Sequence, residues 1–369
     1  MITVDDAGTY LLENGYIGVE AILDGGLVIT STPRRNRNLR VVQGDRPGYL
    51  IKQPDPGNPG AFQTLASEAA FYQACEDLES LEGLRPFLPR LRMRDDKHAL
   101  FGLELLQDAM PLWQRYAQSG NADFPNPIPE AIGMALGTIH RCCRKIMRKS
   151  QLPWLQDQLP WALKVHKPGP ELFGGLSQAN FRTIQIIQTM EGVAGNLDKL
   201  RGLWRADTII HNDVKSDNVL VIREPDGRES IRFVDWELVQ WGDPAWDVAG
   251  MLQDFVMFWL FSMTDTQGST EAMAASATYP LMVLQPAIRG FWKGYRTGAD
   301  LDAAASATLL HRAIPFSAAR LIQSAYELAQ TAPALPVQSV LLLQISANML
   351  RDPEASQVQL YGLFQTVNR

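Results

Sequence analysis

Residues 211–247 decide the fold, and they read HNDVKSDNVLVIREPDGRESIRFVDWELVQWGDPAWD. Two short β-branched runs, 219–222 and 231–234, flank a turn that contains the pair Asp226-Gly227. Such a turn between two apolar runs predicts a β-hairpin. A hairpin brings the residue that enters it and the residue that leaves it to one place, so this stretch is expected to gather polar side chains.

Three of those side chains suit phosphoryl transfer. Asp213 and Asn218 precede the first strand of the hairpin, and Asp235 follows the second strand. Phosphoryl transfer uses one carboxylate that takes a proton from a hydroxyl group, and an amide and a second carboxylate that hold Mg²⁺ on a nucleotide. The order of these residues therefore predicts a site for a nucleotide, a metal ion and an alcohol.

The same stretch resembles the catalytic core of the aminoglycoside phosphotransferase and choline kinase family, a branch of the protein-kinase-like fold. The family pattern is H-x-D, then N, a hydrophobic hairpin, D-W/F-E and G-D-P-x-x-D, and it is matched in order from His211 to Asp247. The resemblance implies that Asp213 is the catalytic base and that Asn218 and Asp235 bind Mg²⁺. It also implies that Asp247 is a buried support of the catalytic loop.

The resemblance implies an α+β, bilobal protein-kinase-like fold, with a small antiparallel-sheet N-lobe and a larger, mostly helical C-lobe. A chain of 369 residues is long enough for two lobes with separate cores. We expect residues 1–106, with a short helix at about 9–17, to form the nucleotide-binding lobe. Residues 107–369 are expected to form the catalytic and substrate lobe, and ATP is expected to bind between the two.

The N-terminal third carries the signals of an antiparallel sheet and one helix. Apolar, β-branched runs separated by turns predict five strands. The strands fall at residues 27–30, 39–43 and 49–53, and the last two fall within 84–106. The helix is predicted at about 64–78, between the third and fourth strands.

Five residues of this part are candidates for holding the nucleotide. Lys52 lies in the third strand and Glu68 in the following helix, in the order in which the family orients its phosphate-binding lysine. The alternative for Lys52 is a side chain that simply points to solvent. No G-x-G-x-x-G lies between the first two strands, so Ser31 and Thr32 are the candidates for covering the phosphates, with a solvated hairpin tip as the alternative. The resemblance places the hinge that holds the adenine at Glu104–Gln107.

Beyond residue 111 the apolar spacing is helical. Helices are predicted at about 129–148 and 178–204, and in series through the C-terminal third. His140, in the first of these helices, is expected to be structural and not catalytic. Residues 150–205 read as an insertion to which the sequence assigns no role.

The acceptor is the least determined part of the prediction. Lys215, two residues after Asp213, is typical of Ser/Thr protein kinases and favours a peptide Ser/Thr hydroxyl, whereas the family resemblance equally favours a small-molecule hydroxyl. From residue 251 onward eight acidic residues stand against seven basic ones, which disfavours a dedicated aminoglycoside pocket. With a peptide acceptor the chain would be similar to kinase-like components of modified-peptide biosynthesis, where a lyase would be its partner.

Two other functions stay open beside the ATP- and Mg²⁺-dependent phosphotransferase. One is a catalytically silent kinase-like protein that binds nucleotide or acts as a scaffold, and the other is a nucleotidyl transferase on the same fold. The first is disfavoured because a degenerate kinase usually lacks one of the key residues, and this chain has all four: Lys52, Asp213, Asn218 and Asp235.

Composition argues against several classes of partner. A net charge of -6 and a pI near 5.5 argue against general nucleic-acid binding. The longest apolar block, residues 255–263, is too short to span a bilayer, and the first residues do not resemble a signal peptide. Cys75, Cys142 and Cys143 have no metal-ligand spacing and read as reduced thiols. We therefore expect a soluble, cytoplasmic protein with no membrane or nucleic-acid partner.

Overall fold

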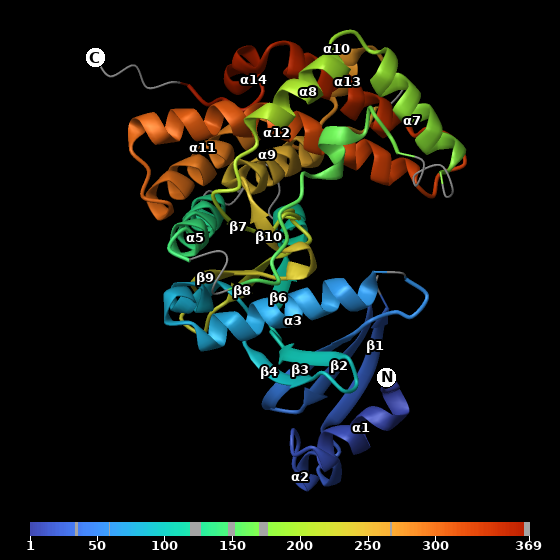
Figure 1. Cartoon of the computed structure of the whole chain (residues 1–369), viewed down its shortest axis with the longest axis vertical. Coiled ribbons are helices and arrows are strands. Elements are labelled where there is room, and N and C mark those ends of the chain that lie inside the picture. Colours follow the sequence, from blue (N-terminus) through green and yellow to red (C-terminus); the bar gives the residue numbers. More distant parts are fainter. Residues whose placement is uncertain are drawn as a thin grey trace. The chain divides into compact units, whose positions relative to one another are not determined.

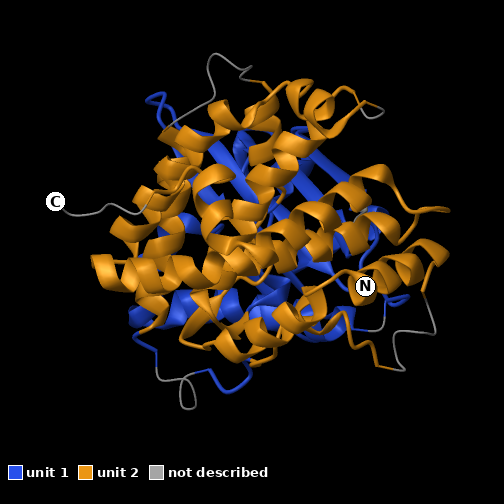
Figure 2. Cartoon of the chain, turned by 90° about the horizontal axis from the view of Figure 1, so that it is seen from above, with its two compact units in different colours: residues 1–111, 145–155, 218–239 blue, residues 112–144, 156–217, 240–369 orange. Residues whose placement is uncertain are grey.

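The computed structural model describes seven stretches of the chain, whose elements divide into two compact units (Figure 2). The described stretches are residues 1–33, 36–58, 60–118, 127–146, 152–169, 176–265 and 268–364. Unit 1 comprises residues 1–111, 145–155 and 218–239, and unit 2 comprises residues 112–144, 156–217 and 240–369. The predicted hairpin thus belongs to unit 1, and the loop with Asp213 that precedes it belongs to unit 2.

A five-stranded antiparallel sheet is the centre of unit 1 (Figure 1). Its strands follow the order β1-β2-β3-β5-β4, and all neighbours pair antiparallel. The strands are β1 (Leu27–Pro33), β2 (Arg37–Gln43), β3 (Arg46–Gln53), β4 (Leu91–Asp95) and β5 (Leu100–Glu104). The five strands predicted from the sequence are confirmed.

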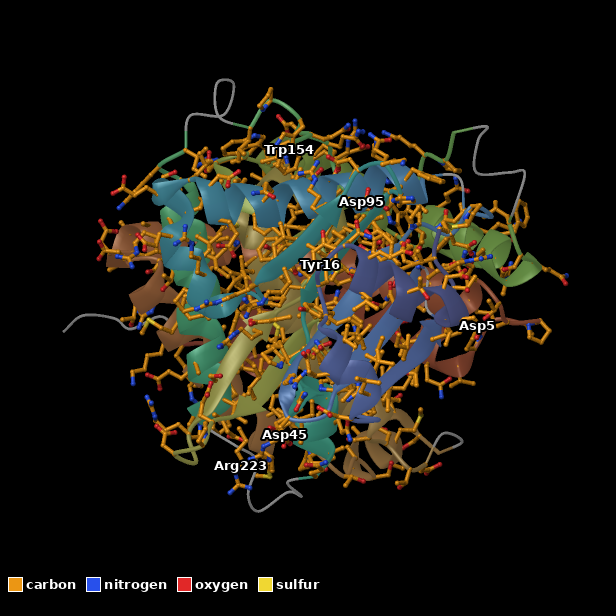
Figure 3. The ribbon with its side chains drawn as sticks, turned by 90° about the horizontal axis from the view of Figure 1, so that it is seen from below. Asp5, Tyr16, Asp45, Asp95, Trp154 and Arg223 are labelled. Atoms are coloured by element: carbon orange, nitrogen blue, oxygen red, sulfur yellow. The ribbon has the colours of Figure 1, made fainter. Side chains whose placement is uncertain are left out.

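Two short helices cover one face of this sheet. They are α1 (Val4–Glu13) and α2 (Val19–Leu23). A buried core joins Leu11 of α1 to Leu39 and Ile51 of the sheet. The Tyr10 hydroxyl donates to Asp95 Oδ2 at 2.7 Å, which links α1 to β4 (Asp95 is labelled in Figure 3). These contacts bury one apolar face of the sheet.

The first helix lies closer to the N-terminus than the sequence predicted. Thr3 caps it, since the Thr3 hydroxyl accepts the backbone N–H of Asp6 at 3.2 Å. Asn14 ends it, and Gly15 follows with φ 70°, in the left-handed region that glycine adopts readily. The predicted span of 9–17 missed the cap at Thr3, and the helix α2 was not predicted.

The other face of the sheet carries helix α3 (Ala61–Asp77), whose predicted position is confirmed within three residues. Between α3 and β4 the chain forms the 3-10 helix η1 (Glu79–Phe87), where the sequence predicted the start of a strand. Pro86 and Pro89 lack a backbone N–H and cannot donate to a strand ladder. For this reason strand β4 begins only at Leu91.

A second, three-stranded sheet of unit 1 contains the predicted hairpin. Its order is β6-β8-β9, with β6 (Ala109–Pro111), β8 (Val219–Arg223) and β9 (Glu229–Phe233). Gly227 has φ 83° in the connecting turn, which agrees with the Asp-Gly signal. Val219 pairs with Phe233, and the N–H of Val234 donates to the carbonyl of Asn218 at 3.0 Å. The hairpin therefore holds Asn218 and Asp235, which flank it, at the same end.

Unit 2 is mainly helical. Its elements are α4 (Leu112–Ala117), α5 (Pro127–Cys143), η2 (Trp161–Lys164), α7 (Gln178–Thr189), α8 (Val193–Leu203), β7 (Thr208–Ile210), β10 (Gln240–Gly242), α9 (Pro244–Phe261), α10 (Thr270–Ala275), α11 (Leu281–Gly298), α12 (Ala303–Ala329), α13 (Val337–Arg351) and α14 (Pro353–Gln359). The single helix predicted at 178–204 is two helices, because Gly192 takes φ 75° between them. None of the described helices is long and apolar enough to cross a membrane.

Helices α5 and α11 pack backbone against backbone. The contact uses two glycines on each helix, spaced four residues apart so that they share one face: Gly133, Gly137, Gly294 and Gly298. A Cβ atom on Gly294 would lie 2.0 Å from the carbonyl oxygen of Glu130, and one on Gly137 would lie 2.4 Å from that of Tyr295. No real Cβ contact is that short, so only glycine permits this approach. The packing fixes α5 and thereby His140.

Candidate active site

Lys52 lies between two carboxylates within unit 1. Its Nζ donates to Glu68 Oε1 and Oε2 at 2.8 and 2.6 Å and to Asp235 Oδ1 at 2.7 Å. The side chains of Lys52 and Glu68 are buried, whereas that of Asp235 is 36% exposed. The predicted pairing of Lys52 with Glu68 is present, and the alternative of a solvent-exposed lysine is wrong.

Burial and charge oppose each other in this cluster. Burial alone would lower the pKa of Lys52, but attraction to Glu68 and Asp235 outweighs burial and raises it above its ordinary value. Burial raises the pKa of Glu68 to about 7, although Lys52 acts in the opposite direction. Lys52 is therefore held in its charged form, which is the form that attracts a phosphate group.

The residues after β9 are fixed by helix α3. Asp235 has φ 67° and ψ 57°, a left-handed conformation that is strained for a residue other than glycine. The N–H of Trp236 donates to Glu68 Oε1 at 3.2 Å, and its indole ring stacks on Phe71 with ring centroids 4.3 Å apart. The buried Trp236 thus anchors the strained residue that carries the predicted metal ligand.

Asn218 and Asp235 fit a magnesium ion. Both lie at the same end of the β8–β9 hairpin, as the hydrogen bond between Val234 and Asn218 requires. Carboxylate and amide oxygens are hard ligands of the kind that Mg²⁺ prefers, and Mg²⁺ usually completes its shell with substrate phosphates and water. Within the described stretches, no three His, Cys, Asp or Glu side chains are grouped so as to hold a metal ion.

The sheet register separates Ser31 from Thr32. Thr32 pairs with Asn38, which pairs with Lys52, so these three side chains share one face of the sheet. Ser31 pairs with Leu39, and its side chain lies on the opposite face, which α1 and α2 cover. The side chain of Thr32 therefore lies on the same face of the sheet as the side chain of Lys52. At position 31 only the backbone could contribute to that face.

The β1–β2 turn is tied to the residues that follow β9. Asn36 Nδ2 donates to Glu237 Oε2 at 3.2 Å, and Asn36 is buried at 4% exposure. Glu237 lies two residues after Asp235, the candidate metal ligand. The hydrogen bond from Asn36 therefore joins the turn that precedes β2 to the segment that contains Asp235. Arg34 and Arg35, the basic residues of the turn, lie outside the described residues.

Glu104, at the end of β5, has its side chain bound within unit 1. Its carboxylate accepts the N–H of Arg90 at 3.1 Å and the guanidinium of Arg92 at 3.3 Å. The N–H of Glu104 donates to the carbonyl of Arg90, and the N–H of Leu105 donates to that of Gly48. The hinge role that the family resemblance implies would therefore fall to backbone groups of residues 104–107 other than these two N–H groups.

The two predicted catalytic residues meet in unit 2. Lys215 Nζ donates to Asp213 Oδ2 at 2.7 Å, in the loop that follows β7. Burial alone would lower the pKa of Lys215, but attraction to Asp213 outweighs burial and raises it. Arg320 of α12 lies 3.5 Å from Asp213 Oδ1 and was not predicted. Asp213 thus has one cation at each carboxylate oxygen.

Asp247 holds this loop from the first turn of α9. Its two carboxylate oxygens accept the N–H groups of His211 at 2.7 Å and Asn212 at 2.8 Å, and His140 Nε2 lies 3.2 Å from Oδ2. Burial alone would raise the pKa of Asp247, but the hydrogen bond with His140 and the backbone N–H of His211 lower it. His140 also contacts the Tyr295 hydroxyl at 2.9 Å. These buried contacts agree with a supporting role for both residues.

A cavity of about 300 Å³ lies beside Asp213 within unit 2. Its charged lining comprises four carboxylates and two cations, namely Asp213, Asp217, Asp254, Glu327, Lys215 and Arg320. Both cations lie within 4 Å of Asp213, so the other three carboxylates leave the cavity with excess negative charge. The count of charges from residue 251 onward did not reveal this excess, because three of the six charged lining residues precede residue 251.

Family membership follows from a match that includes Lys52, Asp213, Asn218 and Asp235. The model of the phosphotransferase enzyme family, APH, matches residues 31–277, about two thirds of the chain. The chain belongs to the APH phosphotransferase family. The resemblance drawn from residues 211–247 is thereby confirmed. A comparison with the curated proteins finds no match.

Solved structures of kinases share the fold of this APH-family chain. The ethanolamine kinase of Plasmodium vivax is similar with a TM-score of 0.57 and 14% identity, over 93% of this chain and 88% of that one. An amicoumacin kinase in complex with AMP-PNP, Ca²⁺ and Ami gives 0.53 and 13%, over 93% and 96%. A mutant aminoglycoside 2'-phosphotransferase-IIIa in complex with GDP gives 0.52 and 11%, over 96% and 98%. The predicted α+β, bilobal protein-kinase-like fold is confirmed.

Several residues of these clusters were missed in the sequence, among them Asn36, Asp254 and Arg320. Asn36 lies in a polar turn where no spacing distinguishes it, and Asp254 lies in an apolar helix seven residues after Asp247. Arg320 stands within the apolar run AARLIQSA of α12. A lone charge within such a run signals a buried partner, since charged groups are rarely buried without one. That signal was available for Asp254 and Arg320, but it does not name the partner.

Proposed function

We propose that this APH-family chain is an ATP- and Mg²⁺-dependent phosphotransferase that moves the γ-phosphate to a hydroxyl group. The observation that carries the proposal is the position of Lys52 Nζ, which is bound at once by Glu68 and by Asp235. A buried lysine fixed by a helix glutamate, next to a metal-binding aspartate, is the arrangement that protein-kinase-like enzymes use to hold Mg·ATP. The second support is the cavity beside Asp213.

The nucleotide is assigned to the lobe formed by residues 1–106. Lys52 would contact the α- and β-phosphates, and Glu68 would orient it. Thr32, with the backbone around Ser31, would cover the phosphates, and the backbone of Glu104–Gln107 would hold the adenine. The solved amicoumacin kinase holds AMP-PNP and Ca²⁺, which supports a nucleotide and a divalent cation for this fold.

Asn218 and Asp235 would hold Mg²⁺ on the nucleotide. When bound, the ion neutralises charge on the phosphate oxygens. Trp236 and Glu68 keep Asp235 in its strained conformation, so the chain supplies a ligand that is fixed before the metal arrives. Lys52 then adds a second positive charge on the same triphosphate.

Asp213 would act on the acceptor. The hydroxyl oxygen attacks the γ-phosphorus, the bond from that phosphorus to the β–γ bridging oxygen breaks, and ADP leaves. The hydroxyl proton passes to the Asp213 carboxylate. Lys215, 2.7 Å from Asp213, would balance negative charge that develops on the transferred group.

A small alcohol that carries positive charge is the acceptor we favour. The cavity beside Asp213 has the volume of a small-molecule site and excess carboxylates, and a cationic acceptor would complement it. The solved relatives named above are kinases of small molecules. A peptide Ser/Thr hydroxyl is the second candidate, favoured by the contact of Lys215 with Asp213. A lyase would then be a partner.

The test is a product analysis. The protein is incubated with Mg·ATP and three acceptor sets, namely amino alcohols, neutral sugars and Ser/Thr peptides, and the products are identified by mass spectrometry. Addition of phosphate to an acceptor supports the proposal, and the acceptor set identifies the substrate class. Addition of AMP indicates a nucleotidyl transferase, and Mg·ATP binding without any product indicates a silent protein. We place the reaction in the cytoplasm, where free cysteines such as Cys75 stay reduced.

A further inference from the structure

The loop that carries Asp213 is held from two sides within unit 2. Asp247 accepts backbone N–H groups of the loop, including that of Asn212. Arg320 of α12 donates from Nη1 to the carbonyl of Asn212 at 3.2 Å and from Nη2 to the carbonyl of Val214 at 3.3 Å. One buried anion therefore binds the N–H groups of the loop, and one buried cation binds the carbonyls on both sides of Asp213.

The side chain of Arg320 is buried and packs against an aromatic ring. Its side chain is 4% exposed, and its guanidinium carbon lies 5.4 Å from the centre of the Trp246 ring. The Nη2 atom also lies 3.5 Å from Asp213 Oδ1. A guanidinium presents its donors in a rigid, planar fork, so it can hold two carbonyl groups in one fixed geometry where a lysine cannot. Position 320 lies beyond residues 31–277, the part that the family model matches.

Two backbone features show that the loop needs this support. Asn212 has φ 69°, a left-handed conformation that its surroundings must maintain. Gly250 of α9 leaves room for the loop, since a Cβ atom there would lie 2.5 Å from the carbonyl oxygen of Val214 and 3.5 Å from Arg320 Nη2. The carbonyl that Arg320 binds therefore rests directly on the backbone of a helix.

We propose that Arg320 is a positioning residue for phosphoryl transfer, because it fixes the carbonyls of Asn212 and Val214 and so sets the direction of the Asp213 side chain. The inference rests on the proposed function and adds a residue that the catalytic motif does not contain. Beyond its 3.5 Å contact with Asp213 Oδ1, Arg320 is assigned no part in bond making or bond breaking. It acts through the loop, as Asp247 does from the other side.

The test compares three variants of the full chain. Arg320→Gln removes the charge and the fork, and Arg320→Lys keeps the charge alone. Arg312→Gln is the matched control, because Arg312 is buried on the same helix but binds Asp243, at 2.8 and 3.0 Å, and not the loop. Two readouts are used: hydrogen exchange of a peptide that spans residues 211–217 without nucleotide, and kcat and KM for ADP formation from Mg·ATP with water as acceptor.

For Arg320→Gln we expect kcat to fall by about 100-fold, the loss that a misplaced catalytic group causes, with an unchanged KM for ATP and faster exchange of the loop. Arg320→Lys should recover part of kcat. Arg312→Gln should lower the midpoint of thermal unfolding while loop exchange and kcat stay at wild-type values. Wild-type kcat and exchange in Arg320→Gln would overturn the proposal, and so would equal losses in Arg312→Gln.

Gly250→Ala keeps the test decisive if Arg320→Gln does not fold. It leaves Arg320 intact and adds one methyl group beneath the carbonyl of Val214, so it should lower kcat and speed loop exchange. Wild-type values of both would overturn the proposal. A wild-type protein that forms no ADP would count against the proposed function alone, because the exchange comparison needs no turnover.

Discussion

Lys52 Nζ lies 2.7 Å from Asp235 Oδ1, although 183 residues separate the two along the chain. The contact links the central strand β3 to the residues after β9, and Glu68 completes it from α3. A buried lysine in contact with two carboxylates gives unit 1 a fixed positive charge next to a candidate metal ligand. Under the proposed function, the stability of unit 1 and its affinity for nucleotide would depend on the same atoms.

Lys52→Met should destabilise the protein and abolish Mg·ATP binding. The substitution leaves Glu68 buried without its counter-charge, and the loss of one partner of a buried pair costs about 3–5 kcal/mol of unfolding free energy. Urea unfolding measures that cost. The double variant Lys52→Met with Glu68→Gln should regain about half of it and still bind no nucleotide. Wild-type Mg·ATP affinity in either variant, measured by calorimetry, would contradict the role of Lys52.

Thr32→Val should raise the KM for ATP by about fivefold, the equivalent of one hydrogen bond. Ser31→Ala should change it less, because the side chain of Ser31 lies on the sheet face opposite Lys52. Each variant removes one hydroxyl group, from opposite faces of the sheet, so Ser31→Ala serves as the control for Thr32→Val. An equal or larger effect of Ser31→Ala would contradict this use of the register.

Gly294→Ala should destabilise the protein, since its Cβ would lie 2.0 Å from the carbonyl oxygen of Glu130. Overpacking of this kind costs about 1–3 kcal/mol, and here it would separate α5 from α11. Gly195→Ala, at an exposed position of helix α8, is the control, because nothing lies within 4 Å of its Cβ position. That change should stabilise the protein by about 0.5–1 kcal/mol. If both variants unfold at the same urea concentration, the glycine contact is not what holds these helices together.

Asp254 should make stability depend on pH. Burial raises the pKa of Asp254 from 3.8 to about 6, although the hydroxyl of Ser216, which donates to it at 3.1 Å, acts in the opposite direction. Between pH 4 and 6 the folded protein keeps a proton that the unfolded chain has lost, so this group stabilises the fold at low pH and ceases to do so as pH rises through 6.

The measurement compares wild type with Asp254→Asn by urea unfolding at pH 4.5 and pH 7. The shift in pKa corresponds to about 3 kcal/mol in total, of which about a third is already lost at pH 4.5. The stability of wild type relative to the variant should therefore fall by about 2 kcal/mol between these two pH values. The comparison of two proteins at each pH cancels the contributions of the other acidic groups. A difference that does not change with pH would show that Asp254 is not titrating in this window.

Much of the fold was predictable because its signals are local. The Asp226-Gly227 turn predicts the hairpin, and the five strands of unit 1 follow from β-branched runs and turns. The errors are local as well. Pro86 delays a strand, and Gly192 divides a helix, each through a backbone property that the apolar pattern does not contain.

The candidate site was predictable only where residues keep a fixed order. Lys52 and Glu68 were paired correctly because strand and helix are neighbours in the sequence. Arg320 was missed because it joins the loop across more than 100 residues, and no periodicity signals such a partner. The acidic cavity was missed for the same reason, since Asp217, Asp254 and Glu327 gather only when α9 and α12 pack together.

The most direct test of phosphoryl transfer by Asp213 is the rate of ADP formation from Mg·ATP in wild type and in Asp213→Asn, with ATP affinity measured on the same samples. We predict that wild type forms ADP and that Asp213→Asn binds Mg·ATP with unchanged affinity but forms ADP at least about 100-fold more slowly. A variant that forms ADP at the wild-type rate, or a wild-type protein that releases AMP in place of ADP, would contradict the account.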